Sequence, residues 1–555
     1  MDYLNRFETW RKEESIPQQM RAELDAMVGN DEAIRGAFGA ELAFGTAGIR
    51  GIMGAGTNRL NEFTVRRMAQ GLAQWLLDSG LPARCAIAYD SRHNSRFFAE
   101  ICATVLADSG VKVHLYHELV PTPMLSYAVR ELHCGCGIVV SASHNAGIYN
   151  GIKCYGPDGC QMTDEPAKGV YERIERIAYF TPCASCFDKL VSDGRIAYIP
   201  LSLWEAYYET VLAQGVQLAD VPKAALKVLY TPLCGTGNKP VREVLKRIGV
   251  TVDVVKVQEQ PDGDFKTCEY PNPETDAALN ESYKLARSAD YDLILGTDPD
   301  CDRVAIAVPT DGGFRKLSGN ELGCMLLDYI LGKSERLPQD AECVRSIVST
   351  SMADRIAAHY GCRMKTVLTG FKYIGGEILR LEQEGKQEQF VFGFEESCGY
   401  LKGTYARDKD AVVASMLVCE MAASLKREGK TILQHLNELY AQYGAYLAKV
   451  QSIELKGVDA MQQAAAFMVR VRENTPNEVA GLAVTQVNDY QKGIFGLPKS
   501  NVVEWILGDA ARLIFRPSGT EPKVKIYYTA IGKTEEESKA MMDALWADVA
   551  ALTCK

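Results

Sequence analysis

Residues 137–153 read GIVVSASHNAGIYNGIK, and the rest of the chain can be understood from this stretch. It opens with small and apolar residues and continues into polar ones, which predicts a buried strand that runs into an exposed turn. A turn of this kind can present a hydroxyl group to a ligand, and Ser143 is the candidate nucleophile. His144 and Lys153 could donate hydrogen bonds to an anion or move protons. Taken alone, the pattern also fits an ordinary polar turn.

The size and charge of the chain limit the functions it can have. With about 100 to 200 residues per domain, we expect roughly three to five domains in a chain of 555 residues. The formal net charge of −10 argues against a nucleic-acid-binding protein, because no basic face is available for a phosphate backbone. No run approaches the roughly 18 apolar residues of a membrane-spanning helix, and the charged N-terminal segment differs from a signal peptide. We expect a soluble cytoplasmic protein without a nucleic-acid or membrane partner.

The seventeen cysteines follow no disulfide framework. Their odd number and their positions inside apolar runs predict reduced, mostly buried thiols. Cys183 and Cys186 form a Cys-x-x-Cys pair, which is weak support for a zinc site without a second pair or a nearby histidine. Cys301 and Cys398 stand inside two polar loops described below, so we expect alkylation of these thiols to inhibit by bulk.

Strand-like and helix-like patterns alternate along the chain. In the first part, an apolar strand at residues 85–89 delivers the tripeptide Asp90-Ser91-Arg92 to a loop. The alternation starts again near residues 191 and 316, which predicts α/β sheets with their loops at one edge. The expected domains are residues 1–190, 191–315, 316–445 and 446–555.

A glycine-rich turn at residues 45–51, GTAGIRG, is a candidate anion site. Its glycines let the backbone approach a ligand, and Arg50 offers a two-pronged guanidinium group for phosphate. Because glycine-rich turns are common, this segment gains weight only in combination with other motifs.

Asp298, Asp300 and Asp302 alternate in the sequence DPDCDR, after an apolar strand. Three carboxylates in one short loop repel one another unless a cation balances them, which implies a hard divalent ion. A calcium EF-hand is excluded, because Arg303 and Pro309 stand where that loop needs Gly and Glu. A haloacid-dehalogenase-like phosphatase, in which the first Asp would be the nucleophile, and a solvated acidic turn stay as alternatives.

Four motifs occur in a fixed order: the Ser143 loop, the three-Asp loop, a Glu-Glu-Ser loop at residues 395–397 and an Arg-Pro-Ser-Gly-Thr loop at residues 516–520. This order resembles the α-D-phosphohexomutases, the phosphoglucomutase and phosphomannomutase family, across nearly the whole chain. The family's first loop reads Thr/Ser-Ala-Ser-His-Asn-Pro. Ala146 replaces the proline here, which removes a rigid turn residue but no reacting atom. The resemblance implies an α/β fold of three similar sheet domains plus a smaller α+β C-terminal domain around a central cleft.

The same resemblance implies a role for each motif. At the reacting end it places a phosphoserine with groups for phosphate and proton transfer, namely Ser143, His144, Lys153, Arg50 and Arg303. It makes an oxygen of the Ser143 phosphate a ligand of Mg²⁺ together with Asp298, Asp300 and Asp302. For the sugar and its phosphates it implies Lys372, Glu395, Ser397, Arg407, Lys409, Arg516, Ser518, Gly519 and Thr520.

The expected activity is that of an intramolecular phosphotransferase acting on a small phosphosugar. By resemblance, it is a phosphoglucomutase that interconverts glucose 1-phosphate and glucose 6-phosphate through glucose 1,6-bisphosphate. The Gly-Phe-Glu-Glu-Ser form of the third loop resembles a branch that includes phosphopentomutases, so a phosphomannomutase or phosphopentomutase is an alternative. A non-catalytic sugar-phosphate sensor is disfavoured, because binding alone requires neither Ser143 nor three Asp residues. The sequence leaves the preferred sugar, the general base, the motion of the last domain and the oligomeric state open.

Overall fold

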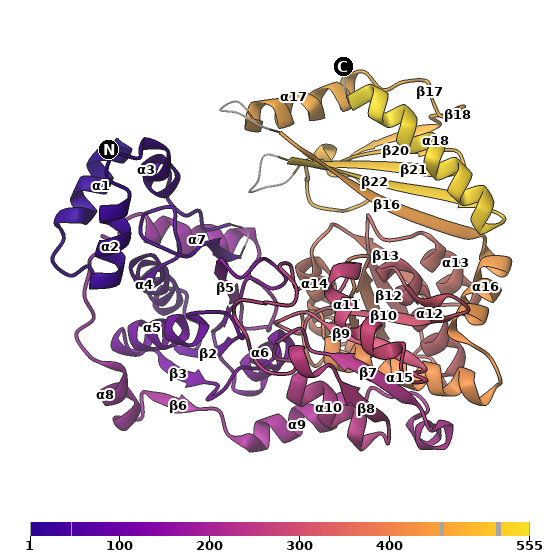
Figure 1. The fold of residues 1–555 in the computed structure, drawn as a ribbon, viewed down its shortest axis with the longest axis horizontal. Coiled ribbons are helices and arrows are strands. Elements are labelled where there is room, and N and C mark those ends of the chain that lie inside the picture. Colours follow the sequence, from indigo (N-terminus) through magenta and orange to yellow (C-terminus); the bar gives the residue numbers. More distant parts are fainter. Residues whose placement is uncertain (1, 46, 456–459, 518–522, 554–555) are drawn as a thin grey trace. The chain divides into compact units, whose positions relative to one another are not determined.

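The computed structural model describes residues 2–45, 47–455, 460–517 and 523–553 (Figure 1). The chain forms two compact units. Unit 1 comprises Met1–Leu317, Gly375–Gln387 and Gly399–Ala423, and unit 2 comprises Ser318–Ile374, Glu388–Cys398 and Ser424–Lys555. Within the described ranges, no helix combines the length and the apolar character needed to cross a membrane.

Unit 1 begins with three short helices, α1 (Tyr3–Lys12), α2 (Gln18–Ala26) and α3 (Asp31–Phe38). Pro17 is the N-cap of α2, and the side chain of Asn30 accepts a hydrogen bond from the third helix, so the sequence sets both helix starts. Their apolar faces pack around Trp10 and Phe38.

The first sheet of unit 1 has six strands in the order β1-β5-β4-β2-β3-β6. They are β1 (Gly48–Ile52), β2 (Arg84–Tyr89), β3 (Lys112–Leu115), β4 (Cys136–Val140), β5 (Tyr149–Tyr155) and β6 (Ile196–Tyr198). Strand β5 is antiparallel to both of its neighbours, and the other pairs are parallel. Strand β6 belongs to this sheet, although the expected boundary at residue 190 assigns it to the second domain.

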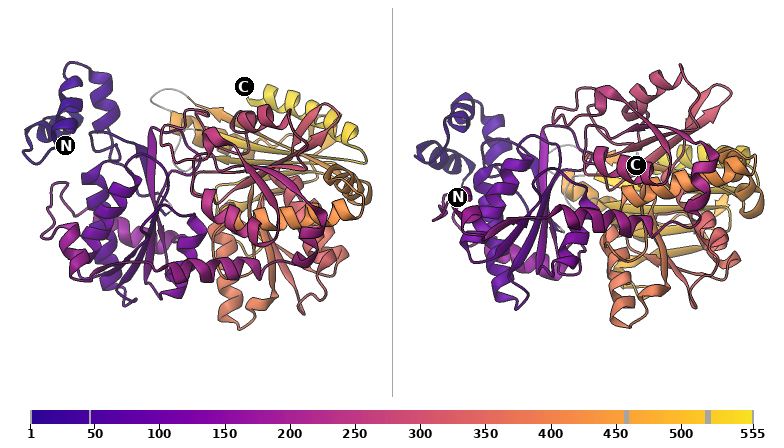
Figure 2. Two further views of the ribbon diagram at one scale, coloured as in Figure 1. Left: turned by 60° about the horizontal axis from the view of Figure 1, so that its bottom comes forward. Right: turned by 90° about the horizontal axis from the view of Figure 1, so that it is seen from below.

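Helices lie on both sides of this sheet (Figure 2). They are α4 (Glu62–Asp78), α5 (Ser95–Asp108), α6 (Thr122–Glu131), α7 (Asp164–Ile174) and α8 (Phe187–Ser192). Every residue of β4 is buried, as its apolar sequence predicts, and six of the seven residues of β5 are buried. The loop between β4 and β5 is therefore anchored at both ends in the core.

The second sheet of unit 1 has the order β11-β10-β9-β7-β8. Its strands are β7 (Lys227–Thr231), β8 (Thr251–Val254), β9 (Leu293–Thr297), β10 (Val304–Thr310) and β11 (Gly313–Lys316), and its helices are α9 (Leu201–Leu212), α10 (Asn238–Arg247) and α11 (Asp276–Ala286). Strands β9 and β10 are antiparallel, with Thr297 opposite Val304. The acidic loop is thus the tip of a hairpin between two buried strands.

The third sheet has the order β13-β12-β14-β15. Its strands are β12 (Glu342–Ser346), β13 (Arg363–Val367), β14 (Phe390–Glu395) and β15 (Gly399–Lys402). The helices of this part of the chain are α12 (Gly319–Lys333), α13 (Met352–His359), α14 (Phe371–Gln383), α15 (Ala411–Arg427) and α16 (Ile432–Tyr443). Strand β14 is fully buried and ends at Glu395, the first residue of the Glu-Glu-Ser motif.

The C-terminal part of unit 2 is an antiparallel sheet of order β16-β22-β21-β20-β19. Its strands are β16 (Ala445–Glu454), β19 (Gln486–Asp489), β20 (Val503–Leu507), β21 (Ala511–Pro517) and β22 (Lys523–Gly532), followed by the helix α18 (Glu535–Thr553). Helix α17 (Ala460–Glu473) and a small hairpin of β17 (Glu478–Val479) and β18 (Leu482–Ala483) complete it. The predicted class, three α/β sheets followed by a smaller α+β domain, is confirmed.

Candidate active site

The loop after β4 holds Ser143 in an uncommon backbone conformation. Ser143 has a φ of 52°, in the left-handed region, which costs energy for a residue other than glycine and tends to occur at functional sites. Its N–H donates to Ser141 Oγ at 2.7 Å, and Asn145 N donates to Ala142 O at 3.2 Å. Tyr149 N closes the next turn on the carbonyl oxygen of Ala146 at 3.0 Å, so the turn forms without a proline at this position.

The three aspartates of the acidic loop face one small volume. All three are buried, and each offers a carboxylate oxygen within 4.8 Å of the others. The backbone N–H groups of Asp302 and Arg303 both donate to Asp298 Oδ1, at 3.1 and 3.0 Å, which folds the loop back on its first residue. Cys301 has a φ of 51° between two of the aspartates. The hairpin tip thereby gathers carboxylates that alternate in the sequence.

Ser143 and the acidic loop are in direct contact within unit 1. Ser143 Oγ donates to Asp298 Oδ2 at 2.8 Å and lies 3.2 Å from His144 Nδ1. Lys153 Nζ lies 2.6 Å from Asp300 Oδ2 and 3.4 Å from Asp302 Oδ2. Lys409 Nζ adds a contact of 3.2 Å to Asp302 Oδ2. Segments more than 250 residues apart in the sequence therefore build one cluster.

The charges in this cluster shift the pKa values of the acids in opposite directions. Burial, followed by the charges of Asp302 and Asp300, raises the pKa of Asp298 well above its ordinary value. Burial also opposes ionisation of Asp300, but Lys153 outweighs it and holds the Asp300 pKa below its ordinary value. We conclude that the triad cannot carry three negative charges at low energy with only the lysines as partners.

The basic groups of the cluster also have shifted pKa values. Burial favours neutral Lys153, yet Asp300 and Asp302 raise the Lys153 pKa above its ordinary value, so Lys153 is an ammonium ion. Burial, together with Arg303 and Arg50, lowers the pKa of His144 well below its ordinary value, so His144 is neutral. A neutral imidazole beside Ser143 Oγ can accept or donate one hydrogen bond without adding charge.

The triad fits a hard divalent cation. Asp300 Oδ1 and Asp302 Oδ1 are buried and have no hydrogen-bond partner among the described residues, and such oxygen atoms are costly unless a ligand satisfies them. Carboxylate oxygens are the donors that hard cations prefer. The two oxygen atoms without hydrogen-bond partners are therefore the observation that favours a cation at this site.

Two arginines predicted near the reacting group lie beside this cluster. Arg303 Nη1 donates to Glu274 Oε1 at 2.7 Å, and Arg303 Nε lies 3.7 Å from Asp302 Oδ1. Arg50 Nη1 donates to Asn145 Oδ1 at 3.4 Å. Glu274 fixes Arg303, a role that the sequence did not indicate, because the two residues lie 29 positions apart without a recognisable motif.

Arg407 lies elsewhere in unit 1. Its side chain is fully buried, and Nη2 donates to Glu382 Oε2 at 2.8 Å while Nη1 donates to the carbonyl oxygens of Thr404 and Ala406. Arg130 Nη2 binds the other oxygen of the same glutamate at 2.8 Å. No contact found among the described residues joins Arg407 to the acidic loop. In this structure the Arg407 guanidinium group pairs with Glu382, and its expected approach to a substrate phosphate stays a prediction.

The remaining predicted residues belong to unit 2. Glu395 is buried, and its Oε1 accepts a hydrogen bond from Gly370 N at 2.7 Å, which ties the segment before Lys372 to the Glu-Glu-Ser loop. Lys372 Nζ lies 5.1 Å from the centroid of the Tyr373 ring. Arg516 is the last residue but one of strand β21. Ser518, Gly519 and Thr520 fall outside the described residues, as does Thr46 of the glycine-rich turn.

Glu396 is a second acid of this loop to which the sequence gave no role. Ser346 Oγ and Ser349 Oγ donate to Glu396 Oε2 at 3.1 and 3.3 Å, and Glu396 N donates to Ser349 Oγ at 3.1 Å. The two adjacent glutamates in Glu-Glu-Ser could have indicated this role. Successive side chains at the end of a strand point to opposite faces, so Glu395 and Glu396 are expected to have different partners.

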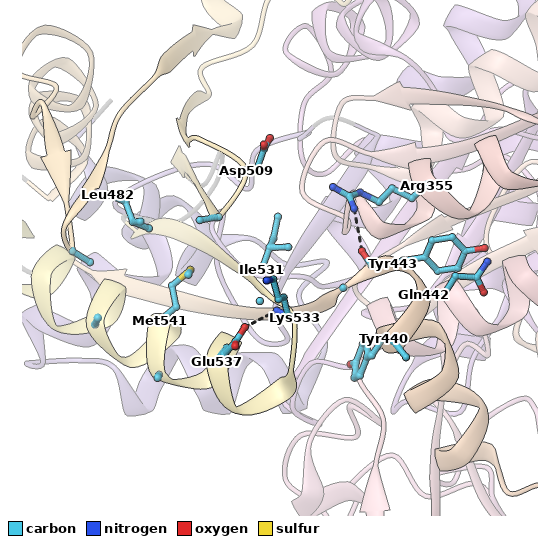
Figure 3. Close-up of a pocket in the computed structure, with 17 residues that line it drawn as sticks. Arg355, Tyr440, Gln442, Tyr443, Leu482, Asp509, Ile531, Lys533, Glu537 and Met541 are labelled. Carbon is cyan, nitrogen blue, oxygen red and sulfur yellow. Dashed lines mark hydrogen bonds between the residues drawn. The ribbon is translucent and has the colours of Figure 1, made fainter.

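A cavity of about 1120 Å³ lies in unit 2 (Figure 3). Arg355 donates to Tyr443 O at 3.3 Å on one side, and Lys533 N donates to Glu537 Oε2 at 2.8 Å on the other. Its apolar wall includes Met541. None of the predicted site residues that the structure describes lines this cavity, so its size does not identify it as the reaction site.

Comparisons with known families cover most of the chain. Models of the α/β/α domains I, II and III of the phosphoglucomutase/phosphomannomutase family match residues 41–180, 205–313 and 318–443. The model of the C-terminal domain of the same family matches residues 468–545. The four matches follow the order of the four sheets described above.

Individual relatives span nearly the full length of the chain. A phosphoglucomutase from Staphylococcus haemolyticus is 36% identical over 526 residues, which cover 92% of this chain and 94% of the relative. The open form of the exocytosis-sensitive phosphoprotein parafusin, a phosphoglucomutase from Paramecium, has a TM-score of 0.70 at 17% identity and covers 92% of this chain and 94% of that one. A Burkholderia thailandensis protein of the same family has a TM-score of 0.68 at 16% identity, with coverage of 92% and 98%. The two solved structures share the fold.

Proposed function

The chain belongs to the phosphoglucomutase/phosphomannomutase family, and we propose that it is a phosphoglucomutase that interconverts glucose 1-phosphate and glucose 6-phosphate. The relatives of 36% identity that carry the name phosphoglucomutase support this proposal. The observation that carries it is the 2.8 Å hydrogen bond from Ser143 Oγ to Asp298 Oδ2, within a buried cluster of three aspartates. A hydroxyl group placed against such a cluster is suited to carry a phosphoryl group beside a bound cation.

In the proposed mechanism, Ser143 is phosphorylated and Asp298, Asp300 and Asp302 hold Mg²⁺. When bound, Mg²⁺ neutralises charge on the phosphoryl group as it transfers. The bond between phosphorus and Ser143 Oγ breaks, a bond to a hydroxyl oxygen of the sugar phosphate forms, and the hydroxyl proton leaves to a base. The resulting glucose 1,6-bisphosphate turns over and returns its other phosphate to Ser143.

Other residues of unit 1 orient the reacting group and balance its charge. Lys153, held as an ammonium ion by Asp300 and Asp302, supplies a hydrogen-bond donor beside the triad and is a candidate for proton transfer. Arg50 and Arg303 are suited to the equatorial phosphate oxygens, because a guanidinium group binds two oxygens at once. Lys409 adds positive charge at Asp302.

Residues of unit 2 recognise the sugar and the phosphate that is not reacting. We assign Glu395 and Ser397 to the sugar hydroxyl groups, Lys372 to the sugar ring and Arg516 to the distal phosphate. The bisphosphate must bind in two orientations, so the distal contacts have to be made to phosphate rather than to one particular hydroxyl group. The assignment of Ser518, Gly519 and Thr520 to the same phosphate stays a prediction, as do the four domain boundaries and the cytoplasmic location.

Two alternatives predict a different use of the same atoms. A non-catalytic sugar-phosphate sensor would require contacts to phosphate, but it would not require a hydroxyl group that is hydrogen-bonded to a buried carboxylate. A haloacid-dehalogenase-like phosphatase would use Asp298 as its nucleophile, but both oxygens of Asp298 already accept hydrogen bonds, from Ser143 Oγ, Asp302 N and Arg303 N. Both alternatives are disfavoured by the Ser143 contact.

The substrate is tested by a coupled assay with Mg²⁺ and catalytic glucose 1,6-bisphosphate. We expect glucose 1-phosphate to be turned over with the highest kcat/KM among the 1-phosphates of glucose, mannose, glucosamine and ribose. A higher value for mannose 1-phosphate or ribose 1-phosphate would favour the phosphomannomutase or phosphopentomutase alternative. Absence of turnover with all four would contradict the enzyme assignment.

A further inference from the structure

The loop after β2 contains a buried ion pair to which the proposed mechanism gives no role. The side chains of Asp90 and Arg92 are both 0% exposed, and Arg92 Nε lies 3.2 Å from Asp90 Oδ2. Ser95 Oγ and Arg92 N both donate to Asp90 Oδ1, at 2.6 and 3.0 Å. These two hydrogen bonds hold the Asp90 carboxylate beside the guanidinium group, with which it forms an ion pair rather than a hydrogen bond. A buried pair of this kind is costly unless other contacts also hold it.

The guanidinium group of Arg92 donates hydrogen bonds to the loop that carries Ser143. Nη1 donates to the carbonyl oxygens of Ala146 and Tyr149 at 2.9 and 3.0 Å. Nη2 donates to the carbonyl oxygens of Ser143 and Asn145. One side chain therefore collects four carbonyl groups of the loop, and buried carbonyl groups need such partners.

Asp90 approaches the same loop from its other end. Asp90 N donates to Val140 O at 3.0 Å, where strand β4 ends. The hydroxyl group of Ser141 lies beside the Asp90 carboxylate and accepts the N–H of Ser143 at 2.7 Å. The N–H and the carbonyl group of Ser143 are thus both fixed by this small group of residues, which explains how a serine is held at a φ of 52°.

A segment of the second sheet domain covers the remaining side of Arg92. The guanidinium carbon lies 4.9 Å from the centroid of the Phe265 ring. Gly147 and Gly263 let the two segments approach closely, since a Cβ added to Gly147 would stand 2.6 Å from Gly263 O. With Asp90 at its edge, Phe265 on its face and four carbonyl groups at its tips, Arg92 has little freedom to move.

We propose that Arg92, oriented by Asp90, is a positioning residue for phosphoryl transfer that sets the place of Ser143 Oγ relative to Asp298. This inference rests on the proposed function of Ser143 as the phosphoryl carrier. A planar guanidinium group can reach four carbonyl oxygens, whereas an ammonium group cannot match that geometry. Displacement of a reacting atom by about 1 Å can lower a rate by roughly 10²-fold.

Arg67 provides a matched control within unit 1. It is also a buried arginine that binds backbone carbonyl groups: Nε donates to Ile174 O and Ile177 O at 3.0 and 2.8 Å, and Nη1 binds Glu41 at 2.7 Å. The segment that it holds contains no predicted site residue. The Arg67→Ala variant therefore measures the loss of stability that follows when a buried arginine no longer donates to backbone carbonyl groups, without a change at Ser143.

The experiment compares Arg92→Lys, Arg92→Ala, Asp90→Asn and Arg67→Ala by steady-state kinetics, melting temperature and hydrogen exchange of residues 143–149. For Arg92→Lys we expect kcat to fall by about 10²-fold, with KM within about threefold of wild type. Added guanidinium ion should restore kcat at least about tenfold in Arg92→Ala and not in Arg67→Ala. Arg67→Ala should keep the kcat of its folded fraction even where its melting temperature is lower.

The inference is overturned if Arg92→Lys and Asp90→Asn keep the wild-type kcat, or if kcat falls equally in the Arg92 and Arg67 variants. If the wild type turns over no phosphosugar, the proposed function fails. Hydrogen exchange then still tests whether Arg92 holds the loop of residues 143–149. Exchange at residues 143–149 must then accelerate in Arg92→Lys and Asp90→Asn but not in Arg67→Ala. Equal exchange in all variants would contradict the positioning role.

Discussion

Two loops of the molecule, one in each unit, are held by buried arginines in the same way. In unit 1, Arg92 binds the carbonyl groups of residues 143–149. In unit 2, Arg345 donates to the carbonyl oxygens of Ser346 and Ser349 at 3.1 and 3.2 Å. Arg512, from strand β21, donates to two carbonyl oxygens of the same loop. Each loop lacks regular secondary structure, so arginine supplies the donors that a sheet would otherwise supply.

The two loops differ in what they carry and in how the arginine is fixed. Asp90, which orients Arg92, is 0% exposed, whereas Asp354, which binds Arg345 through both oxygens at 2.7 Å, is 42% exposed. The first loop presents the hydroxyl group of Ser143, the proposed phosphoryl carrier, and the second presents hydroxyl groups that donate to Glu396. We infer that substitutions around the first loop change the rate of transfer, whereas those in unit 2 change substrate affinity or stability.

The largest effect should come from the acidic triad in unit 1. Asp300→Asn removes one anionic oxygen from the cation site, and we expect kcat to fall on the order of 10³-fold with the fold intact. Chelation of divalent ions should abolish the activity of the wild type, and Mg²⁺ should restore it. Asp311→Asn, at an exposed turn beyond β10, is the control. Unchanged activity in chelator would contradict the metal assignment.

The next effect concerns the lysine that neutralises the triad. Lys153→Met leaves Asp300 without its ammonium partner and Asp302 with Lys409 as its remaining lysine contact, and we expect a loss of about 10²-fold in kcat with a small change in KM. Lys153→Arg keeps the charge and should retain more activity than Lys153→Met. Equal kcat values for wild type and Lys153→Met would show that Lys153 takes no part in transfer.

In unit 2 we expect the effect to appear as affinity. Arg516→Ala should raise the KM for glucose 1-phosphate and the bisphosphate together, because one charge-assisted phosphate contact costs about 1.5 to 3 kcal/mol, or roughly ten- to hundredfold. Phosphorylation of Ser143 should persist. The measurement compares affinity for glucose 6-phosphate and for free glucose. If the variant discriminates between them as well as wild type does, Arg516 is not a phosphate ligand.

A smaller effect, on stability alone, is expected at Asp354. Asp354→Ala removes both acceptors of Arg345, and because the carboxylate is partly exposed we expect a loss of about 1 to 2 kcal/mol in the free energy of unfolding. Urea unfolding measures this loss, with exposed Asp509→Ala as the control. The kcat of the folded protein should not change. A fall in kcat comparable to that of Lys153→Met would contradict the inference that substitutions in unit 2 change affinity or stability rather than the rate of transfer.

The smallest effect should come from thiol alkylation. Cys301 and Cys398 are buried, so we expect reagents to reach them slowly, and the inhibition by bulk that their alkylation would cause stays a prediction. Among the described cysteines Cys186 is exposed, and Cys554 lies outside the described residues. We expect iodoacetamide to label Cys186 first, without loss of activity. Inactivation that follows the labelling of Cys301, measured by peptide mapping, would contradict this prediction.

The sequence could predict the parts of the site that depend on residue type and on strand ends. Ser143 and the three aspartates follow the apolar strands β4 and β9, so their side chains are delivered to the ends of these strands, whereas Lys153 lies inside strand β5. The role of Arg92 could not be predicted, because its acceptors are backbone carbonyl groups, which leave no signature in the sequence.

Strand β6 and Arg407 show two other limits. Strand β6 has three residues, too few for a periodic pattern, and its place in the first sheet depends on pairing with β3. Arg407 lies in the loop between β15 and α15 and has a residue type suited to phosphate, but its partner Glu382 on helix α14 becomes its neighbour only through tertiary packing. Residue type indicates what a side chain can bind, whereas the fold decides which partner it meets.

The most direct test of the account is the chemical identity of the phosphorylated residue. The protein is incubated with labelled glucose 1,6-bisphosphate and Mg²⁺, digested and mapped by mass spectrometry. We predict one phosphate, on Ser143, that is stable to acid and resists hydroxylamine, since it is a serine ester. A hydroxylamine-labile phosphate on Asp298, or a stable one on any residue other than Ser143, would contradict the central claim.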